Sequence, residues 1–347
     1  MSDTYIASKG DRLLVTGSSG FIGAKVVELL LEYGFTNIRC FVRPSSRMER
    51  LNSVLSRLTA GREIEIATGD LLSRDSCAAA TEGVSIIYHL AAGFDKSFAA
   101  SFMNSALATR NLLEAFRQFG RPKRFVNVSS FAVYSNLGLK RHAMLDETCP
   151  LEDAPQERFD AYGFGKLKQE EIVKDYGRKH QIPYVILRPG YVFGPGKREL
   201  SGRVGINTFG FFIHLGRSNV LPLTYVDNCA EAILLGGLKP GVEGEIFNVV
   251  DDEVLTSKEF FHQYKKQTGV FSLSLPYFLT RLFCSTWEKY AKSTRNQLPP
   301  VFNRRRCAAE WKGNRYSNQK LKDRLGWKPR VTMKEATESF LAQFSGS

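Results

Sequence analysis

The chain has 347 residues, of which 43% are hydrophobic and 24% are charged. This apolar fraction is sufficient for a folded core, which excludes the disordered and low-complexity classes. No stretch approaches the roughly 20 consecutive apolar residues that span a bilayer. The first dozen residues are polar and lack the apolar segment of a secretory signal. The length predicts one large α/β domain with a substrate-binding addition.

The six cysteines lie far apart without a CxxC pair, and the five histidines show no HxH or HxxxH spacing. This pattern argues against a disulfide framework and against a structural zinc site. We therefore expect no metal and a location in the reducing cytoplasm.

The 48 Lys and Arg residues outnumber the 35 Asp and Glu residues, and most of the excess lies late in the chain. Residues 271–330 hold fourteen Lys or Arg and three Asp or Glu, a net charge of +11. Such a segment fits a nucleic-acid surface, a solvated basic face, or a face toward an anionic substrate or an acidic membrane. Charge alone does not choose among these. The motifs described below predict a small-molecule substrate and no nucleic acid.

Apolar runs and helical periodicity alternate through the first half of the chain. In chain order they predict strand 12–17, helix 21–34, strands 38–43, 63–71 and 85–92, helix 98–119, strand 124–130, helix 162–180 and strand 184–190. Repetition at this spacing gives parallel strands joined by right-handed crossovers. The sequence therefore predicts an α/β fold with a Rossmann-type, doubly wound parallel sheet.

The alternation ends after residue 190. Gly-rich loops, a helix near 226–238 and a short strand at 245–250 then precede a mainly helical tail. We expect this smaller C-terminal region to bind the substrate. The predicted division is a dinucleotide-binding domain at 10–190 completed by parts of 223–250, a substrate-binding region at 191–222 and 251–330, and a C-terminal helix at 331–347.

A glycine-rich loop, TGSSGFIG at 16–23, lies between the first predicted strand and the first predicted helix. Glycines in such a loop allow a tight turn, close approach of a pyrophosphate, and close packing of helix on strand. The helix N-terminus adds N–H groups and a partial positive charge that favour phosphates. The loop therefore predicts a dinucleotide site.

The end of the second predicted strand indicates which dinucleotide is bound. An NAD site usually places a carboxylate there for the ribose 2′-hydroxyl, but this chain has Arg43, with Arg47 close behind. Arginine suits a 2′-phosphate through charge-assisted hydrogen bonds. NADP(H) is therefore favoured, with NAD(H) as the alternative.

Several motifs occur in an order and spacing that resemble one enzyme family. They are the loop at 16–23, GDL at 69–71, HLAA at 89–92, NVSS at 127–130, YGFGK at 162–166, RPG at 188–190, GPG at 194–196, LTYVDN at 223–228 and LGWKP at 325–329. Together they resemble the extended short-chain dehydrogenase/reductases, the NAD-dependent epimerase/dehydratase family, over residues 10–340. The resemblance is closest to the 3β-hydroxysteroid dehydrogenase branch. It also implies a homodimer formed through helices 98–119 and 162–180.

The predicted catalytic chemistry is an exchange between an alcohol and a ketone. Tyr162 and Lys166 are four residues apart and share one face of a helix. A phenol with a pKa of about 10 is a poor base at neutral pH, and a nearby ammonium is expected to lower that pKa. Ser130, at the carboxyl end of a strand, can hold the substrate oxygen. The family pattern selects Ser130 over Ser129, which we expect to contact the backbone.

The resemblance supplies further roles. It implies that Asn104 supports Lys166 through water, that Asp70 bonds the adenine amine, and that Lys166 also contacts the ribose. His89 is interpreted as a core histidine. The predicted catalytic residues are Ser130, Tyr162, Lys166 and Asn104. The predicted cofactor-binding residues are Gly17, Ser19, Gly20, Phe21, Ile22, Gly23, Arg43, Arg47, Asp70, Leu71, Leu90, Ala91, Ala92, Tyr162, Lys166, Pro189 and Val192. Tyr191 and Arg306 are predicted to contact the substrate.

Two positions argue against a standard nucleotide-sugar site. By resemblance, Tyr191 replaces an Asn that contacts the diphosphate, and Pro222 replaces an Arg. The dehydratase Asp-Glu pair is also missing, because Phe131 and Ala132 stand in its place. We therefore expect an NADP(H)-preferring oxidoreductase acting on a secondary alcohol or ketone of a bulky substrate. The alternatives are a nucleotide-sugar epimerase, dehydratase or reductase, and a dinucleotide-sensing regulator without turnover.

The late, basic part of the chain leaves two questions open. Arg304, Arg305, Arg306 and Arg315 offer a way to bind a phosphate-bearing substrate. The apolar segment 271–284 is too short to span a membrane and is interpreted as a plain buried helix. Its alternatives are a helix that lines a greasy pocket and an interfacial helix in peripheral contact with a membrane.

Overall fold

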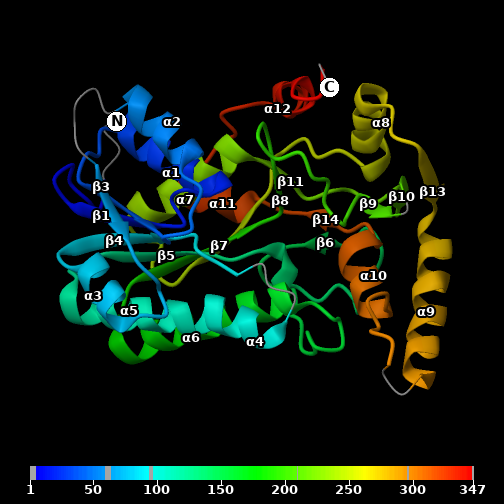
Figure 1. Ribbon diagram of the computed structural model, residues 1–347, viewed down its shortest axis with the longest axis horizontal. Coiled ribbons are helices and arrows are strands. Elements are labelled where there is room, and N and C mark those ends of the chain that lie inside the picture. Colours follow the sequence, from blue (N-terminus) through cyan, green and yellow to red (C-terminus); the bar gives the residue numbers. More distant parts are fainter. Residues whose placement is uncertain (1–4, 59–63, 94–96, 209, 295–296, 346–347) are drawn as a thin grey trace.

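A seven-stranded parallel sheet forms the centre of the computed structural model, which describes residues 5–58, 64–93, 97–208, 210–294 and 297–345 (Figure 1). The strand order is β12-β7-β5-β4-β1-β2-β3. The strands are β1 (Arg12–Thr16), β2 (Ile38–Val42), β3 (Glu65–Thr68), β4 (Val84–His89), β5 (Arg124–Val128), β7 (Tyr184–Pro189) and β12 (Ile246–Val249). The order reverses between β1 and β4, where a crevice opens at the carboxyl ends of the strands. The predicted doubly wound fold is confirmed; residue 63 of the predicted strand 63–71 lies outside the described part.

Helices cover both faces of this sheet (Figure 1). On one face lie α1 (Phe21–Glu32), α2 (Glu49–Leu58) and α7 (Val226–Leu238); on the other lie α3 (Arg74–Thr81), α4 (Phe98–Ser101), α5 (Ala108–Phe119) and α6 (Ala161–His180). Leu13 and Val15 of β1 pack into the core under the first group, and Leu14 packs into the core under the second. Because both faces are covered, β1 is apolar at successive positions rather than at alternate ones.

The long helix predicted at 98–119 is not continuous. A π-helical segment, Phe102–Leu107, separates α4 from α5 and includes Asn104. α6 packs closely against the start of this segment, where a Cβ on Gly165 would collide with the Ser101 hydroxyl. Single π-helical turns inside α-helices often occur at functional sites. The short helices α2 and α3 were not predicted from the sequence.

The C-terminal region adds small sheets to its helices. Its elements are β8 (Tyr191–Phe193), β9 (Gly205–Thr208), β10 (Phe211–Leu215), β11 (Leu223–Tyr225), β13 (Ser272–Leu275), β14 (Arg315–Tyr316), α8 (Ser257–Thr268), α9 (Tyr277–Ser293), α10 (Arg304–Trp311), α11 (Gln319–Leu325) and α12 (Met333–Ala342). β14 pairs in parallel with β6 (Met144–Leu145), which lies between β5 and α6. β13, β10 and β9 form a three-stranded sheet, and β8 pairs in parallel with β11. The Gly-rich stretch after residue 190 therefore contains strands as well as loops.

The interpretation of 271–284 as a plain buried helix is wrong. The segment forms β13 and the first part of α9, where Phe278 is 67% exposed and Leu282 is 60% exposed. α9 lies at the edge of the molecule beside α10 and is buried there at Cys284, while its outer face stays uncovered (Figure 1). Peripheral contact with a membrane remains a prediction. No helix in the described part of the chain is long and apolar enough to cross a bilayer.

Asp251 is a buried carboxyl group just after β12. Its Oδ2 accepts hydrogen bonds from the backbone N–H of Tyr225 at 2.9 Å and from Asn228 Nδ2 at 3.1 Å. Its Oδ1 has no hydrogen-bond partner among the described residues. Burial raises the pKa of Asp251 to about 7. The folded chain therefore binds this proton more tightly than the unfolded chain does.

Asp251→Asn is expected to change how stability depends on pH. Since the folded pKa lies above the unfolded one, the wild-type chain loses stability as the pH rises from about 4 to about 7. The variant lacks this loss. Its free energy of unfolding relative to wild type should rise by roughly 2–3 kcal/mol between about pH 5 and about pH 8, as measured by urea denaturation. Parallel pH profiles for the two proteins would contradict this account.

Candidate active site

A cavity of about 970 Å³ opens in the crevice at the carboxyl ends of the central strands. The glycine loop lies on one side of it, and residues of β8, α10 and the loop before β9 lie on another. Of the predicted cofactor-binding residues, those that line it are Gly17, Gly20, Phe21, Ile22, Gly23, Leu90, Ala92, Tyr162, Lys166, Pro189 and Val192. The described residues contain no group of three or more His, Cys, Asp or Glu side chains arranged to hold a metal.

The glycine loop is shaped so that side chains are excluded. Gly17 has a φ of +70°, and a Cβ there would lie 3.0 Å from the backbone nitrogen of Ala91. A Cβ on Gly23 would collide with the carbonyl oxygen of Gly17. Gly20 is exposed at the start of α1, where the first N–H groups of the helix are not used within it. This bare cradle fits the pyrophosphate of a dinucleotide.

Six predicted cofactor residues lie outside the cavity lining: Ser19, Arg43, Arg47, Asp70, Leu71 and Ala91. Arg43 and Arg47 are exposed just after β2. Asp70 is exposed too, and its Oδ1 accepts a hydrogen bond from the N–H of Leu72 at 2.9 Å. Leu71 is buried, and Ala91 donates to Thr16 Oγ1 at 3.3 Å.

Arg50 and Lys197 are among the basic residues of the cavity lining that the sequence did not indicate. Arg50 of α2 donates to the carbonyl of Gly196 at 2.7 Å. Lys197 donates to the carbonyl of Val192 at 2.9 Å, and its ammonium lies 5.0 Å from the centre of the Tyr191 ring. Arg50 carries no local signal, because the fold alone brings it to the cavity. Lys197 directly follows the GPG motif, which was the only hint.

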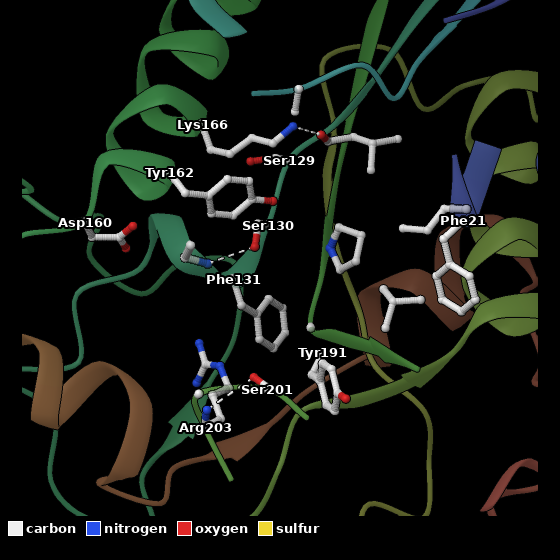
Figure 2. A pocket seen from close by; sticks show the side chains of 18 of the residues that line it. Phe21, Ser129, Ser130, Phe131, Asp160, Tyr162, Lys166, Tyr191, Ser201 and Arg203 are labelled. Atoms are coloured by element: carbon white, nitrogen blue, oxygen red, sulfur yellow. Dashed lines mark hydrogen bonds between the residues drawn. The ribbon is translucent and has the colours of Figure 1, made fainter. Parts of the chain in front are cut away.

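The three central catalytic residues come together on one wall. In Figure 2, Lys166, Tyr162 and Ser130 follow one another along the cavity, with Phe21 on the opposite side. Ser130 caps a short 3₁₀-helix, and its Oγ accepts from the N–H of Ala132 at 3.2 Å. Tyr162 and Lys166 share one face of α6. Asp160 caps the start of this helix, and its carboxylate accepts a hydrogen bond from the N–H of Gly163 at 2.8 Å.

Burial sets the protonation of this wall. It raises the pKa of Tyr162 to about 12, and the hydrogen bond with Ser130 opposes the rise. It also lowers the pKa of Lys166 to about 7. The sequence led us to expect that the ammonium lowers the Tyr162 pKa. In the chain by itself desolvation is the larger effect, because it disfavours both charged forms.

Ser129 does not play the backbone role expected of it. Its Oγ donates to Glu170 Oε1 at 2.6 Å, and Arg188 donates to both oxygens of the same carboxylate, at 2.9 and 2.7 Å. This buried ion pair fixes the end of β5 against α6 and β7. Asn104 lies in the π-helical segment, and its support of Lys166 through water remains a prediction.

The far end of the cavity holds the predicted substrate residues Tyr191 and Arg306. The Tyr191 hydroxyl donates to the carbonyl of Glu199 at 3.1 Å, so its ring is the part turned to the cavity. Arg306 pairs with Glu310 at 3.0 Å. Glu310 and Arg203 also line this end, as Figure 2 shows for Arg203, and the sequence indicated neither.

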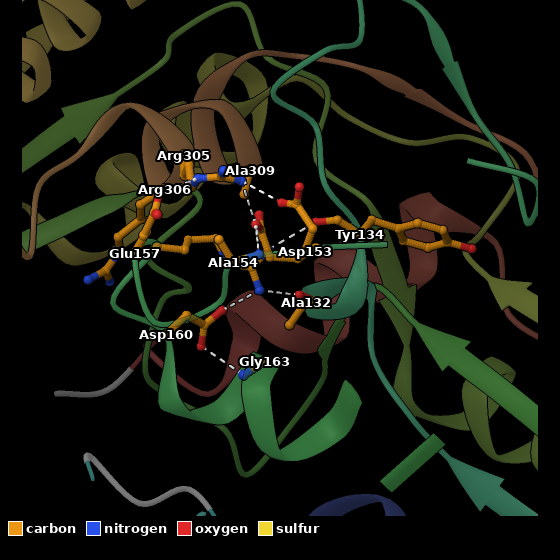
Figure 3. Close-up of polar contacts among 12 residues, drawn as sticks. Ala132, Tyr134, Asp153, Ala154, Glu157, Asp160, Gly163, Arg305, Arg306 and Ala309 are labelled. Carbon is orange, nitrogen blue, oxygen red and sulfur yellow. Dashed lines mark hydrogen bonds and ion pairs between the residues drawn. The ribbon is translucent and has the colours of Figure 1, made fainter. Parts of the chain in front are cut away.

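The four tail arginines do not form one phosphate site. Arg304 pairs with Glu288 at 3.3 Å. Arg305 pairs with Glu152, Asp153 and Glu157, and Figure 3 shows it directed toward Asp153. Arg315 is exposed on β14. Of the four, Arg306 alone lines the cavity.

Comparisons of the sequence and of the structure with known proteins point to the same class of site. Residues 13–249 match the NAD dependent epimerase/dehydratase family. The chain is 25% identical to the sterol-4-alpha-carboxylate 3-dehydrogenase, decarboxylating, of Mus musculus, over 97% of this chain and 92% of that one. It is 30% identical to a 3-beta-hydroxysteroid dehydrogenase of Mycolicibacterium neoaurum, over 75% and 71% of the two chains. A crystal structure of the UDP-glucuronic acid 4-epimerase of Bacillus cereus with UDP-glucuronic acid and NAD superposes with a TM-score of 0.71 at 20% identity, covering 96% and 98%.

The fold and the site define a dinucleotide-dependent enzyme of the Rossmann type. More particularly, the chain belongs to the NAD dependent epimerase/dehydratase family. It is an NAD-dependent oxidoreductase or epimerase, and the resemblance to extended short-chain dehydrogenase/reductases is confirmed.

Proposed function

We propose that this enzyme interconverts a secondary alcohol and a ketone on a bulky, sterol-like substrate. The observation that carries the proposal is the wall of Ser130, Tyr162 and Lys166, which faces the cavity beside the glycine loop. At the far end of the cavity Glu310 pairs with Arg306, and the Tyr191 ring adds apolar surface. The similarity to 3β-hydroxysteroid and sterol dehydrogenases supports the same substrate class.

The residues of this chain account for the proton side of the reaction. The bare cradle of Gly17, Gly20 and Gly23 would hold the pyrophosphate of the dinucleotide, whose nicotinamide, when bound, gives or takes the hydride. The Ser130 hydroxyl donates a hydrogen bond to the substrate oxygen. In reduction, the Tyr162 O–H delivers a proton to that oxygen, and in oxidation the Tyr162 oxygen takes it up. A charged Lys166 ammonium stabilises the tyrosinate that reduction leaves behind.

We further propose that NADP(H) is the preferred dinucleotide. Arg43 and Arg47 are exposed just past the end of β2, beside the glycine loop. Val42 ends that strand, and no carboxylate follows it before Glu49. Two guanidinium groups suit a 2′-phosphate, since each can donate paired, charge-assisted hydrogen bonds.

A nucleotide-sugar epimerase is the second candidate, because Arg203 and Arg306 both line the far end of the cavity. Two guanidinium groups could hold a diphosphate if Arg306 exchanged its partner Glu310 for the substrate. The two candidates differ in what Arg306 does. In the first it only completes an ion pair of the wall, and in the second it binds the substrate directly.

Arg306→Gln separates these two functions. With a steroid alcohol as substrate we expect KM to change by less than about threefold, because the lost group does not touch the substrate. With a nucleotide sugar, KM should rise by about tenfold or more and salt should weaken the wild-type binding. Arg304→Gln is the matched control, since its partner Glu288 lies away from the cavity. Turnover of nucleotide sugars alone, with this KM effect, would replace the steroid proposal by the epimerase.

A further inference from the structure

A chain of buried polar side chains leads from Lys166 away from the cavity. Lys166 Nζ donates to Gln169 Oε1 at 2.9 Å, and Gln169 Nε2 donates to Thr109 Oγ1 at 2.8 Å. The same Oγ1 lies 2.8 Å from His89 Nε2, and His89 Nδ1 lies 2.7 Å from Thr16 Oγ1. Each of these five side chains is at most 2% exposed. The chain of side chains connects α6, α5, β4 and β1, and it ends at Thr16, the first residue of the glycine loop.

The Lys166 ammonium determines the direction of each hydrogen bond in this row of side chains. An ammonium can only donate, so the amide oxygen of Gln169 must face Lys166 and its NH₂ must face Thr109. Thr109 Oγ1 uses its own proton on the carbonyl of Ser105, at 2.6 Å. It therefore accepts hydrogen bonds from its other neighbours. The Gln169 amide has one orientation that satisfies both of its ends.

His89 completes the chain as a neutral imidazole. Since Thr109 Oγ1 accepts, His89 carries its proton on Nε2 and accepts from the Thr16 hydroxyl at Nδ1. Burial, with the nearby Lys166 charge, lowers the pKa of His89 to about 3. The Gln169 amide does not titrate, and the Thr109 proton is already used on the carbonyl of Ser105. This row of hydrogen-bonded side chains therefore holds Lys166 in place and does not conduct protons. The interpretation of His89 as a core histidine agrees with these contacts.

The surroundings of Lys166 make this support necessary. Its two hydrogen-bond acceptors within the described chain, the carbonyl of Val128 at 2.6 Å and Gln169 Oε1, are both uncharged. Among the described residues, the titratable groups near its charge are Glu170 on α6 and His89 on β4, and Figure 2 shows Tyr162 beside it. The Glu170 carboxylate is already bonded by Arg188 of β7, by Ser129 and by Lys174. Within the described residues, only neutral groups accept hydrogen bonds from this buried cation, while the Glu170 charge acts on it without a direct bond.

We propose that Gln169 is a positioning residue of the catalytic site. Its amide oxygen holds the Lys166 ammonium in place beside Tyr162, and Thr109 with His89 fixes that amide against the strand that leads into the glycine loop. Lys166 uses two of its three N–H bonds on Val128 and Gln169, which leaves the third for the cavity. The inference rests on the role of Lys166 in the proposed function, but the bond itself is made without substrate.

Two substitutions of similar size test the proposal in opposite directions. Gln169→Leu removes the acceptor, and it should lower the pKa of Lys166 by about one pH unit because the charged form loses a hydrogen bond. Gln169→Glu replaces the acceptor by a carboxylate, and it should raise that pKa by about one pH unit or more. The pKa is measured by NMR titration of the Lys166 Cε resonance in lysine-labelled protein, assigned by its loss in Lys166→Met.

Dinucleotide affinity is a second measurement on the same variants. Gln169→Leu should bind NADPH about tenfold more weakly at neutral pH, whereas Gln169→Glu should stay within about threefold of wild type. Lys168→Ala is the matched control: its side chain points to the other side of α6, where it pairs with Glu171 at 2.7 Å, and neither reading should change. If Gln169→Leu does not fold, Thr109→Val should give a smaller shift in the same direction, because it frees the amide but keeps the acceptor.

The outcomes separate this inference from the proposed function. An unchanged Lys166 pKa in well-folded Gln169→Leu and Gln169→Glu proteins would overturn the role of Gln169, whatever the substrate is. Opposite pKa shifts together with no turnover of any alcohol would support the role of Gln169 and count against the proposed function alone. A uniform loss of stability without opposite shifts would also overturn the inference, since a merely structural residue behaves in that way.

Discussion

Tyr162→Phe is expected to bind the dinucleotide almost as tightly as the wild-type enzyme and to turn over its substrate roughly 10²–10⁴-fold more slowly. The hydroxyl is the group that transfers the proton, and burial keeps it protonated because the pKa of Tyr162 is about 12. The ring itself packs on the cavity wall and is retained in the variant. Dinucleotide affinity is measured by fluorescence titration, and turnover by nicotinamide absorbance.

The controls for this prediction lie on the same helix. Tyr176→Phe removes a hydroxyl that bonds Glu114 at 3.3 Å, on the part of α6 away from the cavity, and turnover should stay within about twofold. Lys166→Met should weaken dinucleotide binding as well as turnover, since Lys166 lines the cofactor cavity. Wild-type turnover in Tyr162→Phe would remove this tyrosine from the mechanism.

Arg43→Asp is expected to reverse the choice of dinucleotide. Losing a charge-assisted contact should weaken NADP(H) binding by roughly 1.5–3 kcal/mol, which is a factor of roughly 10 to 150 in Kd. The new carboxylate repels a 2′-phosphate and can accept a hydrogen bond from the 2′-hydroxyl of NAD(H), so NAD(H) should bind as well as or better than before. Isothermal titration with each dinucleotide measures both effects.

Arg178→Asp makes the same change in net charge far from the glycine loop. Arg178 is exposed in the last turn of α6, where it pairs with Asp175 at 2.7 Å. The Arg178→Asp variant should leave the ratio of NADP(H) affinity to NAD(H) affinity unchanged, because long-range charge effects are screened by salt. If the wild-type enzyme binds NAD(H) at least as well as NADP(H), the proposed role of Arg43 fails.

Local patterns were the ones that could be predicted. The glycine loop, Tyr162 and Lys166 depend on spacings of a few residues, so the sequence displays them directly. The doubly wound sheet follows from alternating strands and helices. The rule that strand ends meet at one edge places Ser129 and Ser130 near the site, and the family resemblance selected Ser130. The corresponding residues line the cavity together.

Contacts between distant segments could not be predicted. Arg306 was indicated only as one of a run of tail arginines, and its partner Glu310 was missed because nothing in the sequence indicates which carboxylate will face the cavity. Gln169 lies three residues after Lys166, yet its role depends on Thr109 of a different helix. The exposed face of α9 was misjudged for a similar reason: an apolar segment does not reveal whether another element covers it.

The most direct test of the central claim is transfer of a label from substrate to dinucleotide. A 3β-hydroxysteroid deuterated at C3 is incubated with the enzyme and NADP⁺, and the reduced dinucleotide is analysed by mass spectrometry. The account predicts deuterium on the nicotinamide with the wild-type enzyme and almost none with Tyr162→Phe. Unlabelled dinucleotide from every steroid alcohol, together with epimerisation of a UDP-sugar by the same preparation, would contradict it.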